Sequence, residues 1–98
     1  MEKKYLDKSE ESNTIVYTIR WNRTKSIRLK RIRGVSFEEV FDGQLLDICE
    51  HPVHKDQQIL IFDYRGYIWA APFVIDEQGI FLKTLYPSRK YRKLYKKG

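Results

Sequence analysis

The chain has 98 residues, of which 42% are hydrophobic, 14% aromatic and 33% charged, and its formal net charge is +6. This length supports one domain, and the apolar content excludes a disordered chain. The longest stretch without a charge, Gly66 to Ile75, is far shorter than the roughly 20 apolar residues of a membrane-spanning helix. No apolar segment opens the sequence, and Cys49 is its only cysteine, which excludes a disulfide framework within the chain. We therefore expect a cytoplasmic protein without a membrane partner.

Positive charge is concentrated in two segments. Residues 20–33 and residues 83–98 each contain seven basic residues and no acidic one. If both lie on one side of the fold, their combined field attracts polyanions such as nucleic acid. Two alternatives remain open, namely an acidic protein partner and two solvated helix faces that only maintain solubility.

The first half of the chain has clear start and stop signals. Residues 1–14 show no sustained period and predict a flexible extension, ahead of a single domain over residues 15–98. Alternating β-branched and aromatic residues predict a strand over 15–21. Asn22 can cap a following helix, which ends before Gly34.

A second, shorter helix is predicted by the best local signal in the sequence. Ser36 and Glu39 have the spacing of a capping box, in which each side chain binds the backbone amide of the other. The helix is expected to run from Phe37 to Asp42. Glu38 and Glu39 are interpreted as helix-start residues rather than as catalytic acids.

After Gly43 the pattern has period two. It predicts a meander of four strands, over residues 45–50, 58–64, 67–75 and 80–86. Pro72 must then lie at a bulge or an edge. Ser88 can cap a final helix whose docking stripe is formed by Tyr91, Leu94 and Tyr95. The order β-α-α-β-β-β-β-α predicts an α+β fold, a twisted antiparallel sheet with helices packed on it.

Several kinds of chemistry find no support in the sequence. The five glycines are isolated, so no phosphate-binding glycine loop is present. Cys49 lies in a predicted strand and is interpreted as a core residue. His51 and His54, with neighbouring acids, lack a recognisable metal-ligand spacing. We therefore expect neither a metal nor another cofactor.

Three segments carry a family resemblance, and they are Trp21-Asn22-Arg23-Thr24-Lys25, residues 33–40 (RGVSFEEV) and Pro87-Ser88-Arg89-Lys90. With the predicted strand order, they resemble the BrnT family of ribonuclease toxins from type II toxin–antitoxin modules, within the RelE/ParE superfamily. That family typically has Trp-Asp-x-x-Lys, then His-Gly-Val-Ser-Phe-Glu-Glu, and later Ser-Ala-Arg-Lys. The resemblance covers roughly residues 15–90.

The chain departs from the family pattern at several positions. Arg33 stands in place of the usual histidine, Asn22 in place of aspartate, and Pro87-Ser88 in place of Ser-Ala. The family's Glu-Arg pair near the C-terminus has no clear match. A role of that histidine or glutamate in proton transfer therefore has no direct counterpart in this chain.

The resemblance implies a RelE/ParE-like fold and a metal-independent endoribonuclease that slows translation and growth. In such enzymes the ribose 2′-hydroxyl attacks the adjacent phosphorus and leaves a cyclic phosphate or its opened product. The resemblance also implies neutralisation by a small ribbon-helix-helix antitoxin, with operator DNA contacted only through that antitoxin.

This chemistry requires a base, cations over the phosphate and an acid for the leaving oxygen. Arg89 is the first candidate for holding the phosphate because it matches the family's arginine, and Lys90 and Lys83 are the second. His51 is the candidate base, since its unperturbed pKa is near neutrality. Tyr86 or Tyr91 could stack a base or assist proton transfer. The residues expected to contact the RNA backbone, or an acidic antitoxin segment, are Arg28, Arg31, Arg33, Arg92 and Lys93.

Two other functions remain open. A domain of the same fold could bind nucleic acid or a protein without any chemistry, and the missing histidine and glutamate favour this alternative. Inhibition of a topoisomerase, as in other branches of the superfamily, has no sequence feature in its favour.

Overall fold

The computed structural model describes residues 2–7 and 15–95. Its elements, in chain order, are β1 (Glu2–Asp7), β2 (Ile15–Arg20), α1 (Arg23–Arg33), α2 (Phe37–Val40), β3 (Gln44–Glu50), β4 (Gln58–Tyr64), β5 (Tyr67–Asp76), β6 (Gly79–Leu82), β7 (Tyr86–Pro87) and α3 (Arg89–Tyr95). None of the helices in these residues is long and apolar enough to cross a membrane.

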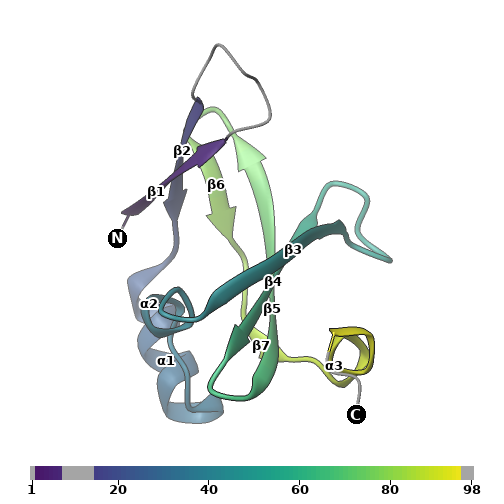
Figure 1. Ribbon diagram of the computed structural model, residues 1–98. Helices are drawn as coiled ribbons and strands as arrows, with labels where there is room; N and C mark the ends of the chain where they lie inside the picture. The colour runs from purple at the N-terminus through teal and green to yellow at the C-terminus, as the bar shows by residue number, and fades with distance from the viewer. Residues whose placement is uncertain (1, 8–14, 96–98) are drawn as a thin grey trace.

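The strands form one sheet with helices on both faces (Figure 1). The strand order is β1-β2-β6-β5-β4-β3, and β7 pairs with β5 beyond the end of β6. One face, which carries Leu60 and Phe62, packs against α1 and α2. The alternate residues Ile59 and Ile61 face the other side, where Tyr91 of α3 covers them. The α+β class predicted from the sequence is confirmed.

The sheet is mixed rather than purely antiparallel, which corrects the predicted arrangement. β2 runs parallel to β6, with Ile19 opposite Ile80. The β3–β6 meander is antiparallel as expected. The direction of β2 depends on how the chain crosses over through α1 and α2, and residue alternation carries no information about that crossover.

Residues 2–7 are not part of a loose extension, because they form β1 and pair antiparallel with β2 from Glu2↔Arg20 to Asp7↔Ile15. The rest of the predicted extension, residues 8–14, lies outside the described residues. The strand escaped prediction because its sequence, EKKYLD, is polar. Polar and charged residues are tolerated on a strand at the edge of a sheet, and alternation is then weak.

The predicted helix caps are present. The Asn22 side chain accepts a hydrogen bond from the Lys25 amide at 2.9 Å, and Gly34 ends α1 with a φ of 85°. Ser36 and Glu39 form the capping box at the start of α2. This helix ends at Val40, two residues before its predicted end at Asp42.

Ser26 fixes α1 against α2. This residue is 1% exposed, and its hydroxyl accepts a hydrogen bond from the Phe37 amide at 3.0 Å while donating to the Glu38 carboxylate. The contact joins the two helices over the shared core, where the Trp21 ring stacks on Phe41. The orientation of α1, and of the cations that it carries, follows from this buried link.

The last predicted strand is interrupted opposite Pro72. The carbonyl of Pro72 accepts a hydrogen bond from the Lys83 amide at 2.8 Å, after which residues 83–85 leave the sheet and return as β7. In an antiparallel strand the nitrogen and the carbonyl of one residue face the same neighbour. The nitrogen of Pro72, which has no hydrogen to donate, therefore faces this interruption, in agreement with the predicted bulge or edge position.

Only part of the predicted docking stripe on α3 is docked. Tyr91 is buried, but Leu94 is 58% exposed and Tyr95 is 38% exposed. The Tyr95 hydroxyl donates to the Asp47 carboxylate of β3. This hydrogen bond, followed by partial burial, raises the pKa of Tyr95 to about 12.

Candidate nucleic-acid interface

Four basic side chains lie close enough to interact electrostatically where α1 faces the end of β6. Lys25, Arg28 and Arg33 come from α1, and Lys83 comes from the residue after β6. We call these four residues the cationic cluster. Burial lowers the pKa of the Lys25 amine, and the charges of Lys83, Arg28 and Arg33 lower it further.

The cationic cluster borders a pocket of about 380 Å³. Lys25, Arg28 and Lys83 line it together with the polar side chains of Asn22 and Thr24 and with two apolar residues of β6, Phe81 and Leu82. Among the residues that the structure describes, those lining this pocket include no aspartate or glutamate. The acids of the two ion pairs, Asp76 and Glu39, instead bind Arg20 and Lys30, outside the cluster. An anion entering this pocket meets cations, neutral hydrogen-bonding groups and an apolar wall from β6, and no described carboxylate.

Backbone and side-chain contacts hold the cluster in place. Arg33 donates from Nη1 to the Leu85 carbonyl and to the Thr84 hydroxyl, which ties the end of α1 to the interruption between β6 and β7. The backbone amide of Lys83 donates to the Pro72 carbonyl of β5, which fixes Lys83 where β6 ends. The guanidinium of Arg33 retains further N–H groups, so it can take part in anion binding without leaving its partners.

A second basic pocket lies where α3 begins. Its volume is about 320 Å³, and it is lined by Tyr67, Ile68, Pro87, Ser88, Arg89 and Arg92, a set that we call the Tyr67 pocket. The Arg92 guanidinium carbon lies 5.4 Å from the centre of the Tyr67 ring, a cation–π contact. Tyr67 is nevertheless 54% exposed.

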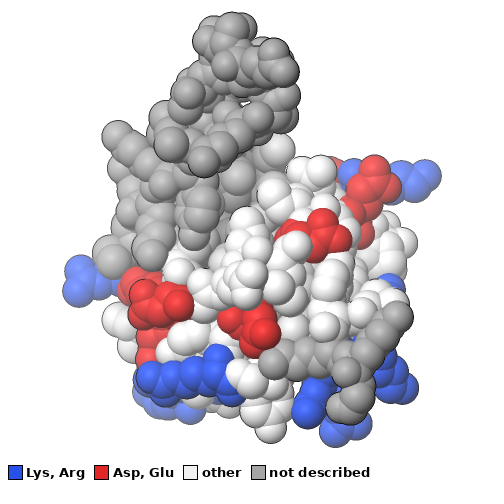
Figure 2. Space-filling view, in the orientation of Figure 1, with Lys and Arg blue, Asp and Glu red and all other residues white. Residues whose placement is uncertain are grey.

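The two basic segments gather at one end of the molecule. α1 and α3 both lie at the end of the sheet where β4 turns into β5 (Figure 1). In the space-filling view, lysine and arginine side chains concentrate along this lower end, whereas acidic side chains occupy the middle of the visible face (Figure 2). Residues 83–89 connect the cationic cluster with the Tyr67 pocket. The two basic segments can therefore act on one polyanion.

His51 lies away from both basic sites. Across the sheet, Glu50, Gln58, Phe73 and Leu82 are successive register partners, so His51 and Lys83 are separated by three strand spacings, roughly 14 Å.

The imidazole of His51 also has a structural role. Its Nδ1 accepts hydrogen bonds from the amides of Val53 and His54, at 3.1 and 3.0 Å. The neutral ring therefore carries its proton on Nε2 and offers no free acceptor. The pocket beside it, of about 520 Å³, is also lined by Glu50 and Asp56, which oppose a polyanion. These contacts occupy the Nδ1 acceptor and therefore disfavour the predicted role of His51 as the general base.

Tyr86 and Tyr91 belong to the core under α3. Tyr91 is 7% exposed and receives a hydrogen bond from the Cys49 thiol at 3.5 Å, so it has no ring face for a nucleobase. Burial raises the pKa of Tyr91, and the Cys49 contact raises it further. Burial, with a smaller effect of Cys49, also raises the pKa of the half-buried Tyr86. The predicted roles in stacking and proton transfer are therefore disfavoured for both Tyr91 and Tyr86.

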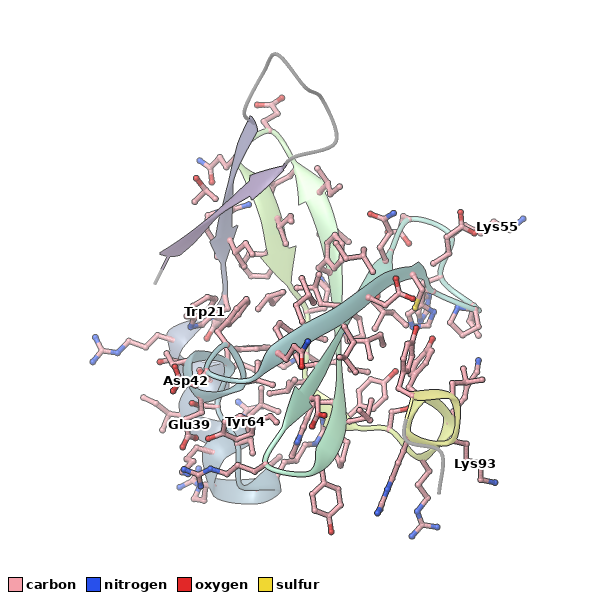
Figure 3. All side chains as sticks on the ribbon, viewed as in Figure 1. Trp21, Glu39, Asp42, Lys55, Tyr64 and Lys93 are labelled. Atoms are coloured by element: carbon pink, nitrogen blue, oxygen red, sulfur yellow. The ribbon has the colours of Figure 1, made fainter. Side chains whose placement is uncertain are left out.

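The remaining predicted residues divide between the two basic sites and the solvent. Arg89 and Arg92 line the Tyr67 pocket, whereas the Lys90 amine lies over the Tyr91 ring at 5.5 Å. Lys93 points away from the sheet (Figure 3), and Arg31 is exposed on α1.

The structure adds two functional candidates that sequence reasoning missed. One is Lys25, the lysine of the WNRTK segment, and the other is Tyr67. Lys25 could have been found, since it occupies the lysine position of the family's Trp-Asp-x-x-Lys motif. Tyr67 has no sequence signal, because an aromatic residue next to a hairpin turn is usually a packing residue.

Among the described residues, no group of three or more histidine, cysteine, aspartate or glutamate side chains is placed to hold a metal ion. Comparison of the chain with known protein families, curated proteins and solved structures finds no match.

Proposed function

We propose that this chain is the toxin of a type II toxin–antitoxin module, a RelE/ParE-like endoribonuclease that binds RNA at the cationic cluster. One observation carries the proposal. Lys25, whose pKa is lowered by burial and by three neighbouring cations, borders a pocket whose described lining has no acid. Such a site attracts phosphate and contains an amine that can release its proton more readily than an ordinary lysine.

The cluster provides the groups that RNA cleavage needs. Arg28, Arg33 and Lys83 stabilise the negative charge that develops on the phosphate oxygens. Lys25, in its neutral form, takes the proton of the 2′-hydroxyl as that oxygen attacks phosphorus. The bond from phosphorus to the 5′-oxygen breaks, and the leaving oxygen takes a proton from the Lys83 ammonium or from water. The product is a 2′,3′-cyclic phosphate, and no metal takes part.

The motifs that carry the BrnT resemblance support the same location. Lys25 belongs to the first motif and Arg33 to the second, and both are members of the cationic cluster. Arg33 replaces the family's histidine, and arginine does not lose its proton at neutral pH. We therefore assign the role of base to Lys25, and Arg33 contributes positive charge at the phosphate.

The proposal includes the partners implied by the resemblance. A ribbon-helix-helix antitoxin neutralises the toxin by placing an acidic segment over the cationic cluster, which excludes RNA. Operator DNA is contacted only through the antitoxin.

Inducible expression of the wild-type chain and of Lys25→Met, followed by growth and total RNA integrity, tests the proposal. We expect the wild type to arrest growth and degrade RNA, and Lys25→Met to do neither at equal levels of folded protein. Arg31→Gln is the matched control, since Arg31 is an exposed cation of α1 outside the cluster. Full toxicity of Lys25→Met would refute the assignment of the base, and harmless, RNA-sparing wild-type protein would refute the toxin proposal.

A second candidate is a nucleic-acid-binding module without catalysis. It is favoured by the position of His51, because the structure keeps the histidine that was expected as base away from the cluster. Purified protein that binds RNA in a salt-sensitive manner, but leaves it intact in the presence and absence of ribosomes, would favour this candidate.

A further inference from the structure

Tyr67 presents an aromatic ring to solvent at the basic end of the sheet. It begins β5 directly after the turn formed by Arg65 and Gly66 and is paired in register with Tyr64. Tyr64 is buried in the core at 7% exposure, whereas Tyr67 is 54% exposed. The two paired tyrosines therefore differ in burial. Core packing explains why an aromatic residue stands at position 64, but it does not explain the one at position 67.

The surroundings of Tyr67 form a built pocket. Ile68 and Ser88 are joined by a hydrogen bond from the Ser88 amide to the Ile68 carbonyl at 2.9 Å, which fixes the start of α3 against β5. Arg92 places its guanidinium over the Tyr67 ring, and Arg89 lines the same pocket. The volume of about 320 Å³ lies within the range of small-molecule sites.

The chemistry of this pocket matches one nucleotide. Proteins read single-stranded RNA by stacking unpaired bases on aromatic rings and on arginine guanidinium planes, and by holding the backbone with cations. The Tyr67 pocket combines an exposed ring, a guanidinium over that ring and a second arginine. An acidic peptide would bind the two arginines, but the exposed aromatic ring would contribute nothing to its binding.

We propose that the Tyr67 pocket binds one unpaired nucleobase of single-stranded RNA, with the base stacked against Tyr67 and Arg92 and the adjacent phosphate held by Arg89. This inference rests on the proposed function, namely that the chain binds RNA at the cationic cluster. Residues 83–89 connect the two sites, so a base held at the Tyr67 pocket fixes which phosphate of the strand reaches the cluster. Tyr67 is thus a positioning residue that determines where RNA is cut.

The test measures binding of a labelled uridine decamer and, by competition, of inorganic polyphosphate, which carries charge but no bases. We expect Tyr67→Leu to weaken binding of the decamer by about tenfold or more. Tyr67→Phe should bind like the wild type because it keeps the ring, and polyphosphate should bind all three proteins equally. Tyr95→Leu is the matched control, since Tyr95 is an exposed tyrosine that does not line the pocket.

A fluorescent variant gives a second, independent measurement. In Tyr67→Trp the new indole should be quenched by the decamer and not by polyphosphate, against a background from Trp21 and Trp69, which are both buried. Unchanged decamer affinity in Tyr67→Leu, in a wild-type protein that does bind RNA, would overturn the inference alone. Equal weakening for decamer and polyphosphate would also overturn it, since the loss would then concern charge. Failure of the wild type to bind RNA would overturn the proposed function together with the inference.

Discussion

Neutralising the cationic cluster should change how strongly RNA binding depends on salt. The perturbation is a triple variant with Lys25→Gln, Arg28→Gln and Lys83→Gln. Arg33 is left in place because its guanidinium also holds the Leu85 carbonyl, so its replacement would disturb the end of α1. The other three have no such contact to the backbone of residues 83–85 among the hydrogen bonds of the described residues.

The magnitude follows from the number of phosphates that the cluster neutralises. For single-stranded nucleic acid, each neutralised phosphate contributes about 0.7 to the slope of log affinity against log salt concentration. Removing three contacts should therefore lower the slope by about 2. Between 50 and 200 mM salt, the wild type should lose about 20-fold more affinity than the triple variant.

Fluorescence anisotropy with a labelled single-stranded RNA, titrated at several salt concentrations, measures both slopes. The matched control carries Arg31→Gln, Lys55→Gln and Lys93→Gln, which removes the same charge from exposed positions. Lys55 and Lys93 both point outward, away from the sheet (Figure 3). An equal drop in slope for both variants would refute the reasoning, because binding would then follow net charge and not the cluster.

Three further predictions concern stability. Ser26→Ala leaves the buried Phe37 amide without its acceptor, so the free energy of unfolding should fall by about 1–3 kcal/mol and the melting temperature by about 4 °C or more in circular dichroism. Lys25→Met should raise stability near neutral pH, because the folded-state pKa of this amine is lowered; denaturant titrations should show the gain shrinking as the pH rises towards 10.5. Glu39→Gln should lower stability at neutral pH, because the Lys30 hydrogen bond lowers the pKa of Glu39, and this difference should vanish in acid as the pH falls from 4.5 through that pKa.

Each of these predictions has a contradicting outcome. An unchanged melting temperature in Ser26→Ala would mean that water replaces the lost hydroxyl at the junction of α1 and α2. If Lys25→Met is still more stable than the wild type above pH 10.5, the added stability comes from the apolar methionine side chain and not from removal of the charge. If Glu39→Gln is still less stable than the wild type below the folded-state pKa of Glu39, the loss of stability comes from the altered geometry of the capping box and not from the charge.

The helix boundaries illustrate what sequence reasoning can predict. Asn22, Gly34 and the Ser36–Glu39 pair act on backbone groups within four residues of themselves, so their spacing alone identifies the start of both helices and the end of the first. The turn between β4 and β5 is equally local, since Arg65 and Gly66 both adopt positive φ in a two-residue hairpin. β1 is the exception, because its pairing with β2 and not its own polar sequence makes it a strand.

The candidate site was only partly predictable. Arg28, Arg33 and Lys83 were proposed from charge and resemblance, and the structure brings them together in the cationic cluster. The structure disfavours the role predicted for His51. That prediction used only the ordinary pKa of histidine, whereas the hydrogen bonds to its Nδ1 come from loop amides that only the folded chain positions.

The sequence by itself determined the caps of the first two helices, most of the strands after Gly43, the α+β class and the concentration of positive charge in two segments, because these properties depend on neighbouring residues. Only the tertiary structure decided that β2 runs parallel to β6, that Lys25 and Lys83 line one pocket, and that Tyr67 faces solvent beside Arg92. The reason is physical. Lys25 and Lys83 lie far apart in the chain, and their proximity at one pocket results from core packing and strand register across the whole sheet, which no local pattern encodes.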